Sequence, residues 1–274
     1  MRYTRKGMIQ YYKEVPLQSW NEAKHYFEAL LDENRAWIFR GHYKSEWPLQ
    51  PSLERILSRK PVDLTIERKI IAEFQRRAHQ YLSSTEIPRA LIEWLALMQH
   101  HGSPTRLLDW SRSPYISAFI AFEDTYKEDG EVAIWAIDSQ WLQEISLQRL
   151  EKDRGAPVAL ETLRNDEELE RLMRCDLRVL LPMEPERMNE RLTIQQGLFL
   201  FPSGNELSFE SALAGYEPDG SRHHMRKITL PKSEGLNCLV DLLRMNINAA
   251  SLFPGLDGFA RSLRTIPDIT YAGG

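Results

Sequence analysis

Apolar and polar positions alternate along the chain in a way that predicts helices and strands in irregular order. Helical spacing of apolar residues predicts helices over residues 19–33, 64–82, 88–100 and 114–124. Short apolar runs predict strands over residues 36–39, 131–137, 176–181, 197–202 and 225–230. The charged stretch 139–174 and the C-terminal stretch 233–264 also have helical spacing. Because no regular βαβ period is present, the pattern favours an α+β fold, a small mixed or split β-sheet with packed helices.

Two helix starts carry specific signals. Ser19 and Glu22 have the spacing of a capping box. Ser113 followed by Pro114 has the pattern of an N-cap with proline at the first helical position. Since Gly102 and Pro104 end the preceding helix, residues 102–113 form a loop, in which residues 105–108 could make a very short strand.

The segment from Gln99 to Phe122 is unusually polar for a stretch between two apolar runs. Thr105, Arg106, Asp109 and Trp110 precede the helix start at Ser113. A helix N-terminus offers free amides and a positive dipole end, so this segment is a candidate anion site. Two alternatives stay open: Arg106 and Asp109 pair with each other to hold the loop, and Trp110 fills the core.

Arg40 and Gly41 end a predicted buried strand. An arginine there can hold a phosphate or carboxylate through two parallel hydrogen bonds, and a glycine lets a ligand approach the backbone. A structural salt bridge is the alternative for Arg40. Gln196 stands before a later strand, where its amide could bond a ribose hydroxyl or satisfy a buried backbone group.

His100 and His101 are adjacent at the end of a predicted helix. Neighbouring helical residues point about 100° apart, so they do not form a metal-binding pair. With no third ligand at a suitable spacing, we predict no metal site. One histidine is expected to cap the helix, and His101 is our candidate to line a pocket.

Charge and composition exclude several classes of protein. A formal net charge of −4 over 274 residues argues against a general electrostatic grip on nucleic acid. No apolar run approaches the roughly 20 residues that span a bilayer, and the first residues do not resemble a signal peptide. Cys175 and Cys238 predict free thiols in a reducing cytoplasm. The glycine-rich phosphate loops, the HExxH zinc motif and the GxSxG nucleophile motif do not occur.

Four stretches of the chain resemble one family, the FRG domain, named for the tripeptide that stands here as Phe39, Arg40 and Gly41. The stretches cover residues 37–55, 95–124, 191–201 and 245–264. The resemblance implies a single FRG domain over residues 1–274, with 139–174 as a helical insertion. His42 stands where the family commonly has glutamine. The family's frequent occurrence in bacteria and phages would fit a role in defence.

A more distant resemblance is to ADP-ribosyltransferases, which bind NAD without a Rossmann motif and use an arginine at the end of a first strand. That resemblance implies a nucleotide, NAD, as substrate rather than as a permanently bound cofactor, and a protein or nucleic acid as acceptor. Those enzymes carry a late glutamate where this chain has Gln195 and Gln196. Either another acid serves, with Asp109, Glu123 and Glu206 as candidates, or the site binds a nucleotide without that chemistry.

Two hypotheses follow. In the first, the chain recognises NAD and transfers ADP-ribose or cleaves NAD, with no membrane partner. Arg40, Asp109 and Gln196 would act in catalysis, and the ligand would also contact further residues: Gly41, His101, Thr105, Arg106, Trp110 and Arg191. In the second, the chain is a non-enzymatic binding or regulatory module, and its Arg and Asp residues form a structural network.

Overall fold

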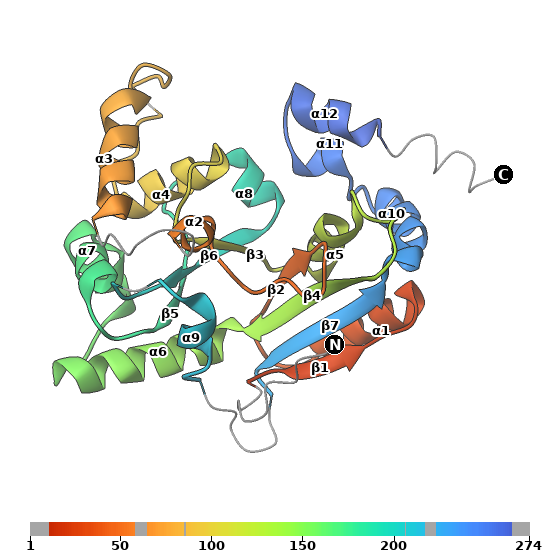
Figure 1. Cartoon of the computed structure of the whole chain (residues 1–274), viewed down its shortest axis with the longest axis horizontal. Coiled ribbons are helices and arrows are strands. Elements are labelled where there is room, and N and C mark those ends of the chain that lie inside the picture. Colours follow the sequence, from red (N-terminus) through yellow and green to blue (C-terminus); the bar gives the residue numbers. More distant parts are fainter. Residues whose placement is uncertain (1–10, 58–64, 85, 206, 217–222, 265–274) are drawn as a thin grey trace.

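The computed structural model describes residues 11–57, 65–84, 86–205, 207–216 and 223–264. A mixed sheet crosses the middle of the molecule (Figure 1), with strand order β1–β7–β4–β2–β3–β6–β5. The strands are β1 Lys13–Pro16, β2 Trp37–His42, β3 Leu108–Ser111, β4 Glu131–Asp138, β5 Leu180–Met183, β6 Gly197–Pro202 and β7 Met225–Pro231. β1 and β7 are parallel, and the other neighbours are antiparallel. The predicted mixed sheet with packed helices is confirmed.

Helices cover both faces of this sheet (Figure 1). Those in the first half of the chain are α1 Trp20–Leu31, α2 Ser52–Leu57, α3 Ile66–Ala78, α4 Leu91–His100 and α5 Pro114–Phe122. Those in the second half are α6 Ser139–Arg154, α7 Asp166–Arg174, α8 Glu190–Ile194, α9 Phe209–Leu213, α10 Gly235–Arg244, α11 Ala249–Leu252 and α12 Leu256–Ser262. Short 3₁₀ turns lie at Leu160–Arg164 and Lys232–Glu234. None of the described helices is both long and apolar enough to cross a membrane.

The sheet is split between β2 and β3. β2 pairs with β4 along its whole length, and β3 pairs with β6 along its whole length. β2 and β3 pair only where Phe39 faces Ser111. The two strands therefore separate beyond that pair, and the sheet has two halves joined at one point.

Three apolar clusters fill the space around the two halves. On one side of the sheet, α1, α5 and α10 cover β2, β4 and β7, whereas α4 and α7 cover β5 and β6. On the opposite side a single cluster spans both halves beneath α6 and α9. The side that carries two separate clusters is therefore open at the split.

Gly41 brings α5 against β2. A Cβ atom at Gly41 would lie 2.0 Å from the backbone oxygen of Ser117 and 2.9 Å from the nitrogen of Ala121. Gly41 therefore allows the close contact between a strand and a helix. Gly41 also lines the cleft described below, so its predicted place beside a ligand stays a prediction.

Both predicted helix starts are confirmed. The Ser113 side chain accepts a hydrogen bond from the amide of Ile116, and the Ser19 side chain accepts one from the amide of Glu22. The Glu22 carboxylate accepts from the amide of Gln18 rather than from that of Ser19, so the capping box is shifted by one residue.

Several predicted boundaries were wrong. The strand expected over 105–108 is β3 at Leu108–Ser111, because the Thr105 hydroxyl accepts from the amide of Leu107 and makes a local turn. The strand expected over 176–181 begins at Leu180. The helical stretch 139–174 is broken after α6 by Gly155, which has a φ of 68°. β1, α2, α8 and α9 were not predicted. Both cysteines are free thiols.

Candidate functional site

A cleft lies where β2 and β3 separate. It has a volume of about 210 Å³. Its polar lining consists of Arg40, Tyr43, Asp109, Ser111, Ser117, Arg191, Gln195 and Arg261, and its apolar lining includes Phe39, Trp110, Ile116, Ile120 and Phe253. A smaller hollow of about 60 Å³ adjoins it and shares Asp109, Arg191 and Gln195. The site is thus built from β2, β3, α5, α8 and the α11–α12 segment.

Arg40 bridges the two separating strands. Its Nη1 donates to the backbone carbonyl of Asp109 at 2.7 Å, and its Nε donates to Nε2 of His42 at 3.2 Å. Alternate residues of a strand share a face, which places His42 beside Arg40. Burial, followed by the Arg40 charge, lowers the pKa of His42 to about 3, so its ring is neutral and can accept. Among the described residues, Nη2 of Arg40 has no hydrogen-bond partner and can take an anion.

Asp109 is the acid of the cleft. Its side chain is 53% exposed, and its Oδ2 lies 3.9 Å from Nη1 of Arg40. Oδ2 accepts from the Gln99 amide at 2.7 Å, and the Gln99 oxygen accepts from the Thr105 hydroxyl at 2.5 Å. This chain of hydrogen bonds orients the carboxylate while leaving it open to a ligand.

Two further arginines give the cleft a positive excess. The guanidinium carbons of Arg191 and Arg261 lie 4.7 Å and 4.4 Å from the ring centroid of Phe253. Within the described part of the chain, Arg191 has no carboxylate at ion-pair distance. Burial lowers the pKa of Arg191 and the Asp109 charge opposes this shift, but a guanidinium stays protonated in proteins. Three guanidiniums around one carboxylate favour an anionic ligand.

Two buried hydrogen-bonding groups near the cleft are unsatisfied. Oγ of Ser117 and Nε1 of Trp110 have no partner among the described residues, although both side chains are almost fully buried and both residues line the cleft. An unsatisfied buried polar group costs about 1–3 kcal/mol. Such groups at a cleft are where the polar atoms of a ligand would be accommodated.

Comparison with protein families assigns part of the chain. Residues 35–130 match the model of the FRG domain. This part of the chain is therefore similar to the FRG domain. Neither the curated proteins nor the solved structures give a match. The wider extent of the domain over residues 1–274 stays a prediction.

The matched FRG region supplies only part of the cleft. Arg40, Asp109 and Ser117 lie inside it. Arg191, Gln195, Phe253 and Arg261 lie outside it, so the second half of the chain completes the site. The structure brings five predicted residues together here: Arg40, Gly41, Asp109, Trp110 and Arg191.

Arg106 lies away from the cleft, in a buried ion pair. Its Nε and Nη2 donate to the Glu67 carboxylate at 2.8 Å and 2.5 Å, and its Nη1 donates to the carbonyl of Pro202 at 2.7 Å. The alternative in which Arg106 pairs with Asp109 was wrong. Thr105 is fully buried and reaches the site only through Gln99.

Gln195 lines the cleft and Gln196 does not. Gln196 is exposed and has a φ of 48°, which turns the chain into β6. Gln195 lines both hollows, and its amide donates to the carbonyl of Leu252 at 3.1 Å. Glu206, a candidate acid, lies outside the described residues.

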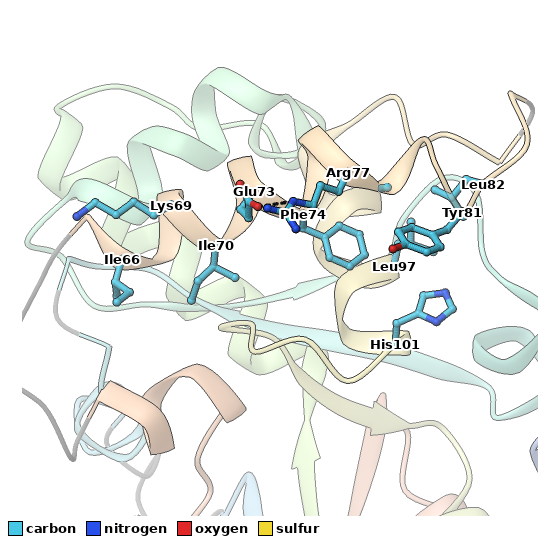
Figure 2. Close-up of a pocket in the computed structure, with 11 residues that line it drawn as sticks. Ile66, Lys69, Ile70, Glu73, Phe74, Arg77, Tyr81, Leu82, Leu97 and His101 are labelled. Carbon is cyan, nitrogen blue, oxygen red and sulfur yellow. Dashed lines mark ion pairs between the residues drawn. The ribbon is translucent and has the colours of Figure 1, made fainter.

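His101 lines a different hollow, the larger one between α3 and α4 (Figure 2). This hollow measures about 970 Å³ and its lining is mostly apolar, including Ile70, Phe74 and Leu97. It shares no lining residue with the cleft. His100, not His101, lies with Asp109 and Arg191 in the small hollow, where burial lowers its pKa. No group of three metal-ligating side chains occurs among the described residues.

Several residues of this site were not predicted from the sequence, among them His42, Gln99, Phe253 and Arg261. His42 could have been found from its two-residue spacing to Arg40 on a strand. Gln99 opens the polar segment but was not considered as a partner of Asp109. Phe253 and Arg261 lie in the family-like stretch 245–264, but only the folded chain brings this segment to β2 and β3.

Proposed function

We propose that this FRG domain binds a nucleotide in the cleft, with NAD as the first candidate, and transfers ADP-ribose from it or cleaves it. The observation that carries the proposal is the meeting of Arg40, Arg191 and Asp109 around one cleft. Guanidiniums hold phosphate oxygens through parallel hydrogen bonds. The carboxylate supplies the negative charge that a cationic sugar intermediate needs.

The size of the cleft suggests which part of NAD it takes. Its volume of about 210 Å³ is smaller than the roughly 300–1,000 Å³ typical of pockets that enclose a whole ligand. The pyrophosphate and one ribose would therefore lie inside, and the adenosine half would extend over the open side. The small hollow beside Asp109 would receive the departing base.

The reaction would proceed at C1′ of the ribose that carries nicotinamide. The bond between C1′ and the nicotinamide nitrogen breaks, and its electron pair leaves with nicotinamide. Asp109 stabilises the positive charge that develops on the ribose. A hydroxyl of water, or of a protein or nucleic-acid acceptor, attacks C1′ and loses its proton. In this proposal Gln195, rather than Gln196, bonds a ribose hydroxyl, because Gln195 lines the cleft.

The likeness to ADP-ribosyltransferases supports the proposal through the order of its parts, a strand-end arginine followed by a strand and a buried helix. This chain departs from those enzymes because a glutamine stands in place of their late glutamate. In the proposal Asp109 takes over that task, since its carboxylate is oriented by Gln99 and exposed to the cleft.

We expect labelled NAD to bind the full chain and to be consumed, as measured by calorimetry and by release of nicotinamide. Arg191→Ala should weaken binding about tenfold or more, because it removes a charge-assisted hydrogen bond. Asp109→Asn keeps an oxygen for Gln99 and should bind NAD normally, yet lower turnover about 10²-fold or more.

The matched control is Arg244→Ala, since Arg244 is an exposed arginine of α10 that pairs with Asp241 and does not line the cleft. It should leave binding and turnover unchanged. Absence of both NAD binding and NAD loss in the unmodified chain would overturn the proposal.

A non-enzymatic binding module is the second candidate. It is favoured by the two hydrogen bonds that Arg40 makes within the protein, which show a structural task for this residue. Arg40→Lys keeps the positive charge but loses the parallel donors of the guanidinium. This variant therefore distinguishes the two candidate functions. If Arg40→Lys binds NAD normally but has a lower free energy of unfolding, Arg40 is structural and the module is supported. If the variant is as stable as the unmodified chain but binds NAD more weakly, the nucleotide site is supported.

A further inference from the structure

α12 contributes a residue that belongs to two sites at once. Arg261 lines the cleft, and its Nη2 also donates to Oε2 of Glu123 at the end of α5. Glu123 directly follows α5, and α12 lies above α5 in the view of Figure 1. Arg261 can therefore interact either with a ligand in the cleft or with the acid behind it.

Glu123 is an unusual partner for an ion pair. Its side chain is only 3% exposed, and its Oε1 is buried without a hydrogen-bond partner among the described residues. Burial raises the pKa of Glu123 to about 7, although the Arg261 charge opposes this shift. A carboxyl group in this setting changes its charge near neutral pH.

The charged and titratable groups around Glu123 come from three segments. Asp124 lies next to it in the chain, with Oδ2 at 3.7 Å from Arg261. Arg264, beyond α12, lies 3.8 Å from Asp124. Tyr43 follows β2, and burial raises the pKa of its hydroxyl, so it stays neutral. Glu123 is thus the group of this cluster that titrates between about pH 6 and pH 8.

We propose that Arg261 is the third anion-binding residue of the cleft, that Glu123 competes with the ligand for it, and that the ligand class is a polyanion such as a pyrophosphate. This inference rests on the proposed function and specifies the charge of its substrate. When Glu123 is protonated, Arg261 loses its buried ionised partner and keeps only the longer contact with Asp124, so it can join Arg40 and Arg191 on the ligand. When Glu123 is ionised, it holds Arg261 back.

The direction in which pH changes ligand binding follows from the charge of Glu123. Lowering the pH through about 7 neutralises Glu123, and binding of a pyrophosphate ligand should tighten. A pyrophosphate diester such as ADP-ribose keeps its charge over this range, so the ligand does not mask the effect. His42 stays neutral because burial lowers its pKa to about 3. His100 is the other group to control, and His100→Asn should leave the pH profile in place.

The experiment measures the binding of ADP-ribose and of inorganic pyrophosphate to the full chain by calorimetry at about pH 6 and about pH 8. For ADP-ribose, the unmodified chain should bind about tenfold more tightly at the lower pH. Glu123→Gln should bind tightly at both. Arg261→Ala should bind about tenfold more weakly and lose the pH dependence.

Arg244→Ala is again the matched control, because it removes one exposed positive charge of α10 without touching the cleft or the charged groups around Glu123. It should leave affinity and pH profile unchanged. Urea unfolding of each variant separates a loss of the fold from a loss of the binding group.

The outcomes separate the two proposals. Binding of ADP-ribose that neither Arg261→Ala nor Glu123→Gln alters, or that Glu123→Gln weakens, overturns the inference and leaves the nucleotide site standing. Binding of pyrophosphate that Arg261→Ala weakens, but no binding of ADP-ribose or NAD, supports the anion site and overturns the proposed function. Binding of neither probe overturns both.

Discussion

Two arginines show how the exposure of a side chain separates structural from ligand-binding use. Arg106 has a side chain that is 3% exposed, and the Glu67 carboxylate and two backbone carbonyls occupy its donors. Arg40 is 21% exposed and keeps an amino group without a partner among the described residues. The residue type is the same, but only Arg40 can still take a ligand.

At the scale of single residues, we expect Glu67→Ala to lower the free energy of unfolding by about 3–5 kcal/mol. The substitution leaves the guanidinium of Arg106 buried without its carboxylate. Urea unfolding followed by circular dichroism measures the loss. Glu73→Ala, on the same helix, removes a carboxylate from exposed pairs with Arg76 and Arg77 and should change little. Equal losses in the two variants would contradict the structural assignment of Arg106.

At the scale of elements, the contact between β2 and α5 decides where the cleft forms. α5 lies against Gly41 on one side of the split, and its residues Ser117 and Ile120 line the cleft. If α5 moved away from β2, Glu123 and α12 would move with it. The glycine of the FRG tripeptide therefore acts on the site through packing.

We expect Gly41→Ala to destabilise the fold by at least about 3 kcal/mol, because its Cβ would meet backbone atoms that cannot rotate away. Thermal unfolding provides the measurement. Gly102→Ala is the comparison: Gly102 has a φ of 75° and open space around it, so only backbone strain of about 1–2 kcal/mol is added. If the two variants were equally stable, close packing of α5 would not be the reason for the glycine.

At the scale of the whole molecule, two buried ionisable groups act on stability with opposite sign. The pKa of His42 falls from 6.5 to about 3 on folding, so the unfolded chain binds more protons between these values and stability rises with pH. The pKa of Glu123 rises from 4.5 to about 7, so the folded chain binds more protons and stability falls with pH over that range. Where these two pH ranges overlap, His42 and Glu123 change the stability of the fold in opposite directions.

We expect His42→Gln to remove the rise of stability between about pH 3 and 6.5 and to leave the fall that Glu123 causes up to about 7. The amide oxygen of glutamine can still accept from Nε of Arg40, so the cleft should persist. Urea unfolding at a series of pH values gives both profiles. An unchanged rise at acidic pH in the variant would show that His42 is not its source.

Local signals in the sequence were sufficient for much of this fold. β6 was predicted with its observed bounds, and the N-cap of α5 was predicted from Ser113 and Pro114. Arg40 and Asp109 were recognised as site residues and they line one cleft. These features depend on local signals: the period of the hydrophobic residues, a capping side chain or the end of a strand. Because each signal involves only residues close together in the chain, the sequence alone can predict it.

The sequence by itself therefore determined most of the longer elements, the class of fold and the segment that carries Asp109. Only the tertiary structure decided that Arg106 pairs with Glu67, that Gln195 rather than Gln196 faces the cleft, and that Arg261 joins it. The physical reason is the pairing of β2 and β3 at a single position. That register opens the sheet and brings α5, α8 and α12 around the opening, and register depends on contacts between residues far apart in the chain.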